Sequence, residues 1–420
     1  MKIQTPKGTR DFYPELQALQ NYLFTCWQDT CLQYGYEEYE GPMFEHLELY
    51  TGKSGDEIVS QLYHFQDKGQ RDIALRPEMT PTLARLINQK GPALKKPVKW
   101  FSIPRLFRYE RAQKGRLREF YQLNMDIIGS ESTQCELDLI LAIAALLKNL
   151  GLKKQDFSIS ISNRRLLAAI LEQRAVANPT PIYQALDKRA KIPPEKFAAL
   201  LEESGLSPED ISFLDDFMSS KNLDELKSFC QTEEALAAFA ELKNILESLW
   251  ELGLDNCAKL DLSVVRGLAY YTGLIFEVFD ESKSMRAIAG GGRYDDLCSK
   301  LGGPKQTGVG FGMGDVVIAD LLQAKNLLPN LQEDRIDDFI ASFNNPGIQH
   351  FALAEKLREY GFRVSHPLQF QKFKKQMDAA NHCGARKVLF LDSEQAPLGQ
   401  YEIKDLQSGE QSFAAIEDLD

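Results

Sequence analysis

The sequence lacks any apolar run long enough to cross a bilayer, and residues 1–13 are mixed and charged rather than arranged as a secretory signal. These two absences argue against a membrane partner, and we expect a cytoplasmic protein. The remaining composition, 44% hydrophobic and 26% charged, is ordinary for globular proteins and excludes disordered and fibrous classes. A chain of 420 residues is long enough for two or three domains, each with its own core.

Paired cysteines are also missing. The seven cysteines are scattered, odd in number and without a CxxC pair, at positions 26, 31, 135, 230, 257, 298 and 383. This pattern favours reduced core thiols over a disulfide framework or a structural zinc site. We therefore assign no metal ligand among the protein side chains.

The chain also has no excess of basic residues, since its formal net charge is -11. General nucleic-acid binders neutralise phosphates with lysine and arginine, so this balance argues against that class. A nucleic acid held by local basic patches is still compatible with this net charge. The candidate patches are residues 111–118 and 372–375, and either can equally be a solvated face.

The most informative segment that is present runs from Phe107 to Asp126, FRYERAQKGRLREFYQLNMD. Its two ends alternate bulky and polar residues, and its middle is polar, basic and contains a glycine. The pattern predicts a β-hairpin with a long charged loop.

Residues two apart on a strand share a face, so Arg108 can point with Glu110, and Gln122 can point with Asn124 and Asp126. Guanidinium groups beside a carboxamide and a carboxylate suit a phosphate-bearing ligand with a polar organic part. The alternative is a solvated hairpin with ordinary cross-strand charge pairs.

The segment FRYERAQKGRLREFYQ resembles motif 2 of class II aminoacyl-tRNA synthetases in its histidyl form. Further segments resemble histidyl-tRNA synthetase signatures in the same order along the chain: KGTRDFYP, RPEMTPTLAR, VVRGLAYYTG and AGGGRYDDL. The resemblance covers nearly the whole chain.

The resemblance implies an α+β fold, with the antiparallel-sheet catalytic core of class II synthetases, a helical insertion and a C-terminal α/β anticodon-binding-type domain. The expected parts are core residues 1–163 and 253–330, the insertion at 164–252 and the last domain at 334–420. The residue pattern supports this division. Predicted amphipathic helices separated by turn signals fill 164–252, and predicted strands alternate with helices after 334. The resemblance also implies a homodimer whose interface includes a strand ending near Pro42.

The implied activity is the ATP-dependent activation of histidine to histidyl adenylate, with Mg2+, followed by transfer to the 3' end of tRNA(His). Two arginines, Arg108 and Arg266, are the expected catalytic residues at the α-phosphate. Glu110 and Arg116, with Arg108, are expected to bind ATP. The expected histidine-binding residues are Glu78, Thr80, Gln122, Asp126, Arg266, Tyr270 and Tyr271.

Some of these positions also have a purely local interpretation. Thr80 precedes Pro81 and is a candidate helix N-cap, and Glu78 places a favourable charge near that helix N-terminus. The glycines at 290–292 allow a close backbone approach, which the resemblance assigns to the adenylate.

Two positions depart from the family pattern. Ala269 stands where an aspartate is usual, and Val317 stands where motif 3 supplies the arginine that holds the outer phosphates. The second departure favours a rival, the non-catalytic synthetase-like regulatory subunit of ATP phosphoribosyltransferase. An active enzyme must replace the missing charge, and Arg286, Lys305 or an additional Mg2+ are the candidates.

Overall fold

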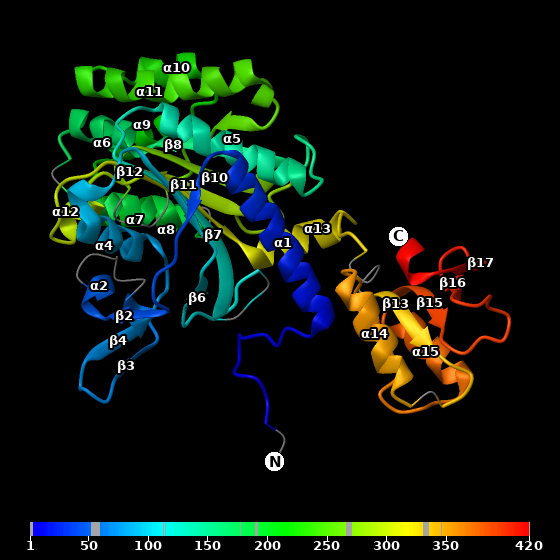
Figure 1. Cartoon of the computed structure of the whole chain (residues 1–420). Coiled ribbons are helices and arrows are strands. Elements are labelled where there is room, and N and C mark those ends of the chain that lie inside the picture. The colour runs from blue at the N-terminus through cyan, green and yellow to red at the C-terminus, as the bar shows by residue number, and fades with distance from the viewer. Residues whose placement is uncertain are drawn as a thin grey trace. The chain divides into compact units, whose positions relative to one another are not determined.

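The computed structural model describes residues 3–51, 59–111, 113, 115–176, 178–189, 192–265, 271–330, 336–345 and 347–419. The chain forms two compact units, Met1–Leu327 and Leu328–Asp420 (Figure 1). None of the helices in the described ranges is long and apolar enough to span a lipid bilayer.

A nine-stranded sheet dominates the described part of the first unit. Its spatial order is β1 (Glu37–Glu38), β5 (Val98–Ser102), β7 (Glu119–Ile128), β12 (Gly308–Gly314), β11 (Ala289–Arg293), β10 (Leu274–Asp280), β8 (Phe157–Asn163) and β9 (Ala258–Leu260), while β6 (Arg105–Phe107) pairs with β7. The central strands β5 to β8 are antiparallel, and only the edge strands β1 and β9 pair in parallel. The antiparallel class II core expected from the sequence is confirmed.

The two faces of the sheet are covered by different helices. Helix α5 (Gln134–Asn149) packs on β7 and β12, and helix α1 (Pro14–Gln33) packs on α5. On the other face, Ile128 of β7 belongs to a core cluster with residues of α4 (Thr80–Lys90) and α12 (Leu297–Lys300). Because side chains alternate along a strand, Gln122, Asn124 and Asp126 lie on the same face as Ile128.

A three-stranded sheet lies beside this core, in the order β2 (Phe44–His46), β4 (Asp72–Leu75) and β3 (His64–Gln66). The short helix α2 (Glu48–Thr51) follows β2, and Tyr50 on it is fully buried. Residues 52–58, which follow α2, lie outside the described ranges.

Helices occupy the sequence between β8 and β9. They are α6 (Arg164–Gln173), α7 (Thr180–Lys188), α8 (Pro194–Glu203), α9 (Pro208–Met218), α10 (Leu223–Ser228), α11 (Glu233–Leu249) and the π-helical turn η3 (Trp250–Leu254). Side-chain capping fixes where several of these helices begin. The N-cap side chains that accept hydrogen bonds from backbone N–H groups are those of Asn163, Ser207, Asn222 and Thr232. Helix α11 contacts both α6 and β8, so these helices and the sheet share one compact unit.

The second unit is a five-stranded mixed sheet with two helices. The strand order is β14 (Val364–Ser365), β13 (Ile336–Ala341), β15 (Ala385–Phe390), β16 (Tyr401–Asp405) and β17 (Gln411–Ala414), with helices α14 (Gln349–Glu359) and α15 (Phe373–His382). Alternate residues of β13 face opposite sides: Ile340 packs with Leu353 and Leu357 of α14, whereas Phe339 packs with Ala380 of α15. A helix therefore covers each face of this sheet.

Some local features differ from what the sequence pattern suggests. Thr80 is the first residue of α4 rather than its N-cap, and Met79 occupies the cap position without a side-chain bond. Strand β8 alternates serine with isoleucine, yet all of its residues are buried. Strand β17 was not expected, because its sequence QSFA carries only a weak alternating pattern.

Candidate active site

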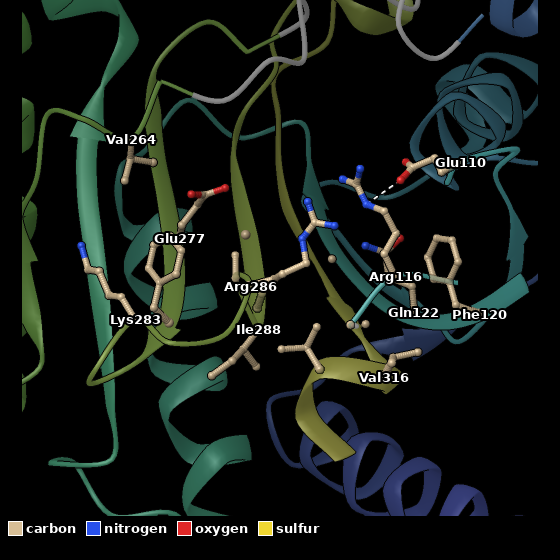
Figure 2. A pocket seen from close by; sticks show the side chains of 18 of the residues that line it. Glu110, Arg116, Phe120, Gln122, Val264, Glu277, Lys283, Arg286, Ile288 and Val316 are labelled. Carbon is tan, nitrogen blue, oxygen red and sulfur yellow. Dashed lines mark ion pairs between the residues drawn. The ribbon is translucent and has the colours of Figure 1, made fainter. Parts of the chain in front are cut away.

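A cavity of about 870 Å³ opens on the face of the sheet that carries Gln122 of β7 (Figure 2). Four predicted site residues line it: Arg108, Glu110, Arg116 and Gln122. Strands β10 and β11 and the start of α13 (Asp315–Ala324) contribute other parts of its wall. The cavity is therefore built from segments that are distant in sequence.

The predicted hairpin is present and forms one wall. Strands β6 and β7 pair from Arg105↔Tyr121 to Phe107↔Glu119. Beyond them the Arg108 N–H donates to the Arg118 carbonyl at 2.9 Å, and Arg116 Nε lies 2.5 Å from Glu110 Oε2. Arg108 is held in turn by its Nε, which donates to the Pro77 carbonyl at 2.8 Å. Two arginines that the sequence predicted at the phosphates thus lie in one cavity, each fixed by a neighbour.

The N-terminal segment ties this hairpin to α13. Arg10 Nη2 lies 2.6 Å from Asp315 Oδ2, and Asp315 Oδ1 accepts the Tyr121 N–H at 3.0 Å. Burial raises the pKa of Asp315, and the Arg10 guanidinium opposes that increase. Gly8 has φ +86° and its carbonyl accepts the Arg118 N–H at 2.8 Å, so glycine suits this position.

The inner part of the site depends on glycines of β12. A Cβ on Gly310 would stand 1.9 Å from Asp126 Oδ1, and one on Gly312 would stand 2.0 Å from Gln122 Nε2. These distances are far below van der Waals contact. The alternating glycines of β12 therefore make room for the polar side chains of β7.

Asp126 is buried, with an exposed fraction of 2%. Tyr294 donates its hydroxyl to Oδ1, and Oδ2 has no hydrogen-bond partner among the residues that the structure describes. Burial raises the pKa of Asp126 to about 7, and the bond from Tyr294 opposes this increase. The site thus contains a buried acceptor that a polar ligand can satisfy.

Of the other predicted histidine-binding residues, Glu78, Thr80 and Tyr271 are buried, and within the described part of the chain they do not line the cavity. Tyr271 packs in the core cluster that also contains Tyr294, and a Cβ on Gly292 would stand 3.0 Å from its ring. Arg266 and Tyr270 lie outside the described residues. The structure places Tyr271 in the same core cluster as the partner of Asp126.

The glycine run of β11 has a packing explanation. A Cβ on Gly291 would stand 2.1 Å from the Gly310 carbonyl, and one on Gly292 would stand 2.6 Å from the Leu274 carbonyl. Both glycines are therefore required by the neighbouring strands, and of the three only Gly290 lines the cavity. Arg293, which follows them, is paired with Glu136 of α5 at 2.6 Å, and this pairing raises its pKa.

Sequence reasoning did not single out Glu277, Lys283 or Arg189, which also line the cavity. Glu277 could have been noticed, because it is the one charged residue inside the apolar strand LIFEVF. Lys283 and Arg189 come from a turn and from the end of a helix, and no local pattern connects either residue with the hairpin. No group of three or more His, Cys, Asp or Glu side chains that could hold a metal ion occurs among the described residues.

Comparisons with known proteins agree with this arrangement. The family model described as histidyl-tRNA synthetase matches residues 8–315. A protein of Opitutus terrae named histidine–tRNA ligase is 40% identical over 414 residues, covering 96% of this chain and 94% of the relative. The relative in Arabidopsis thaliana named as the chloroplastic/mitochondrial histidine–tRNA ligase is 39% identical and covers 100% of this chain and 86% of its own length.

A solved histidyl-tRNA synthetase from Nostoc has the same fold, with a TM-score of 0.83 at 24% identity, covering 99% of this chain and 98% of that one. The matched model spans most of the chain, from the N-terminal segment to the start of α13, and includes every described residue that lines the cavity except Val316 and Val317. On these grounds the chain belongs to the histidyl-tRNA synthetase family.

Proposed function

We propose that the protein is a histidine–tRNA ligase, which activates histidine with ATP and transfers it to the 3' end of tRNA(His). The observation that carries this proposal is the 40% identity, over nearly the full length, to a relative named for that activity. The cavity fits the reaction, because Arg108 and Arg116 line it and the buried carboxylate of Asp126 lies on the same face of β7 as the lining residue Gln122.

In the first step an oxygen of the histidine carboxylate bonds to the α-phosphorus of ATP. The bond from that phosphorus to the bridging oxygen breaks, its electrons go to the leaving pyrophosphate, and histidyl adenylate remains. Little covalent chemistry is asked of the protein, so its contribution is positioning and charge stabilisation. In the second step the terminal ribose hydroxyl of tRNA displaces AMP and accepts the histidyl group.

We assign the phosphate contacts to the two arginines of the hairpin. Arg108, fixed by Pro77, holds the α-phosphate, and Arg116 reaches the outer phosphates. Arg266 is proposed for the α-phosphate on the basis of the sequence resemblance alone.

Mg2+, when bound, neutralises charge on the outer phosphates. The carboxylates of Glu110 and Glu277 line the cavity and are hard oxygen donors, the kind that Mg2+ prefers. We propose that Glu277 would hold the ion together with phosphate oxygens, because Glu110 is engaged by Arg116. Glu110 also fixes Arg116, so it orients the arginine that reaches those phosphates.

We assign histidine selection to Asp126, whose Oδ2 can accept an imidazole N–H. Glu78 and Gln122 are proposed for the ammonium group and Tyr271 for the ring, with Thr80 and Tyr270 completing the histidine site. Carboxylate and carboxamide oxygens are the natural acceptors for an ammonium group.

We also propose roles for the two remaining parts of the chain. We propose that helices α6 to α11, within residues 164–252, help to hold tRNA, and that the unit after residue 334 binds the anticodon. The homodimer and the cytoplasmic location stay predictions from the sequence.

The deciding experiment is the histidine-dependent exchange of labelled pyrophosphate into ATP, followed by charging of tRNA(His). Exchange and charging are both expected in the full chain. A silent exchange assay together with normal histidine binding would favour the alternative, a non-catalytic regulatory subunit of ATP phosphoribosyltransferase.

Two observations favour that alternative. Val317 stands at the motif 3 position, and a solved protein of Bacillus halodurans, titled ATP phosphoribosyltransferase regulatory subunit/histidyl-tRNA synthetase, is 26% identical. Its TM-score is 0.74, covering 92% of this chain and 97% of that one.

A further inference from the structure

The start of α13 forms one wall of the cavity, and residues 315–317 of this wall offer no positively charged side chain to a ligand. Val316 and Val317 both line the cavity, and Asp315 before them is committed to Arg10 and to the Tyr121 backbone. A ligand with several negative phosphate groups needs positive charge on this side from another segment.

Arg286 stands beside this apolar wall. A Cβ on Gly115 would lie 3.5 Å from Arg286 Cδ and 3.5 Å from Val317 Cγ2, so the two side chains flank the same point of the hairpin loop. Both residues line the cavity, and Figure 2 shows the Arg286 guanidinium pointing into it on the side of Arg116. The Arg286 side chain therefore lies beside Val317, on the side of the cavity that a long side chain at position 317 would enter.

Arg286 differs from the other basic residues that line the cavity. Arg116 is paired with Glu110, Arg189 with Asp215 and Lys283 with Asp261, and Arg108 donates to the Pro77 carbonyl. Arg286 has no hydrogen bond or ion pair with any residue in the described part of the chain. Two guanidinium groups that share a cavity, one of them unengaged, favour an anion between them.

The backbone before Arg286 is well fixed. Asp280 accepts the N–H groups of Ser284 at 3.1 Å and Met285 at 2.9 Å, and strand β11 begins three residues after Arg286. A side chain that starts from a hydrogen-bonded turn loses little backbone entropy when it binds a ligand.

We propose that Arg286 holds the outer phosphates of ATP, and the leaving pyrophosphate, in place of an arginine at position 317. This inference rests on the proposed activity and names a residue for its phosphate subsite. Lys305, the other candidate, is 73% exposed at its side chain, lies 3.4 Å from Asp296 and does not line the cavity among the described residues.

The test compares Arg286→Ala, Arg286→Lys and the control Lys305→Ala in histidine-dependent pyrophosphate exchange by the full chain. Arg286→Ala should lower kcat/KM for ATP by about 100-fold or more, as loss of one preorganised electrostatic partner does. Arg286→Lys should recover part of this loss, because it restores the charge without the planar fork. Lys305→Ala should behave as wild type.

Two controls separate a phosphate role from a structural one. Histidine binding and the thermal midpoint should be unchanged in Arg286→Ala, and the KM for pyrophosphate in the exchange reaction should rise together with that for ATP. The double variant Arg286→Ala with Val317→Arg should regain exchange, because the new guanidinium enters the vacated space.

Wild-type exchange with an unimpaired Arg286→Ala variant would overturn this inference and leave the proposed activity intact. A double variant no more active than Arg286→Ala, at an equal thermal midpoint, would also count against it. Absence of exchange in the wild type would instead reject the proposed activity. In that case direct titration of ATP should still be weaker in Arg286→Ala if the phosphate subsite is assigned correctly, and equal affinity would overturn it.

Discussion

At the scale of single residues, Asp126 has one oxygen bonded to Tyr294 and a second without a partner in the described structure. A ligand that fails to donate to this oxygen leaves a buried polar atom unsatisfied, at a cost of about 1 to 3 kcal/mol. This is how a single acceptor can favour an imidazole over side chains without an N–H.

We therefore expect Asp126→Asn to raise the KM for histidine by roughly 10- to 100-fold. The KM for ATP should stay within about threefold of wild type, because Asp126 does not line the phosphate cavity. Pyrophosphate exchange at varied histidine and at varied ATP measures both values. An equal loss for both substrates would contradict the assignment of Asp126 to the imidazole.

The same carboxyl group should make stability depend on pH. Its pKa is raised by burial to about 7, so between pH 4 and 7 the folded protein binds a proton that the unfolded chain has released. The free energy of unfolding should therefore fall as pH rises through this window, by as much as a few kcal/mol.

Asp126→Asn removes this titration, so the difference in unfolding free energy between variant and wild type should shift in favour of the variant from pH 5 to pH 7.5. Urea unfolding without histidine at the two pH values measures the shift. Parallel pH profiles for the two proteins would show that Asp126 titrates normally.

At the scale of elements, the contact of β7 with β12 depends on glycine. A Cβ on Gly310 would meet Asp126 Oδ1 at 1.9 Å and the Met125 carbonyl at 2.7 Å, and the second is backbone that cannot rotate away. We expect Gly310→Ala to destabilise the protein by about 1 to 3 kcal/mol through overpacking.

Gly314→Ala on the same strand is the matched control. Nothing lies within 4 Å of its Cβ position, so its unfolding free energy should change by about 0.5 kcal/mol or less. Urea unfolding of both variants measures the difference. If the two variants unfolded at the same urea concentration, the close approach of the strands would not limit this site.

At the scale of the whole molecule, the chain divides between Leu327 and Leu328 into two compact units. Each has its own sheet and its own buried core, so each is expected to fold without the other. A chain ending at Leu327 should therefore fold and retain the cavity.

This truncated chain should keep pyrophosphate exchange within about threefold of the full chain, since the lining residues all precede Leu327. Charging of tRNA(His) should fall by about 10-fold or more, because the proposed anticodon contacts are lost. Parallel exchange and charging assays test this division. An equal fall in both, or a chain that fails to fold, would refute it.

The sequence by itself determined most of the helices and strands and four of the residues that line the cavity, namely Arg108, Glu110, Arg116 and Gln122. Bulky and polar residues alternate at both ends of the segment 107–126, on either side of its charged loop. This alternation predicted the hairpin, because burial of one sheet face imposes a period of two residues. The order of five short segments along the chain indicated the histidyl-tRNA synthetase family. The helices and strands of the second unit could also be predicted, because each carries its own hydrophobic periodicity. The exception is strand β17, whose pattern is weak.

Only the tertiary structure decided which distant residues meet. The sequence shows glycines at 310 and 312 but not that Asp126 and Gln122 fill the space above them. It shows Arg10 and Asp315, 305 residues apart, but not their ion pair. It offered Arg286 and Lys305 equally, and folding brought only Arg286 to the cavity beside Val317. Local periodicity is a property of neighbours along the chain, whereas these contacts depend on strand order and packing, which no short segment encodes.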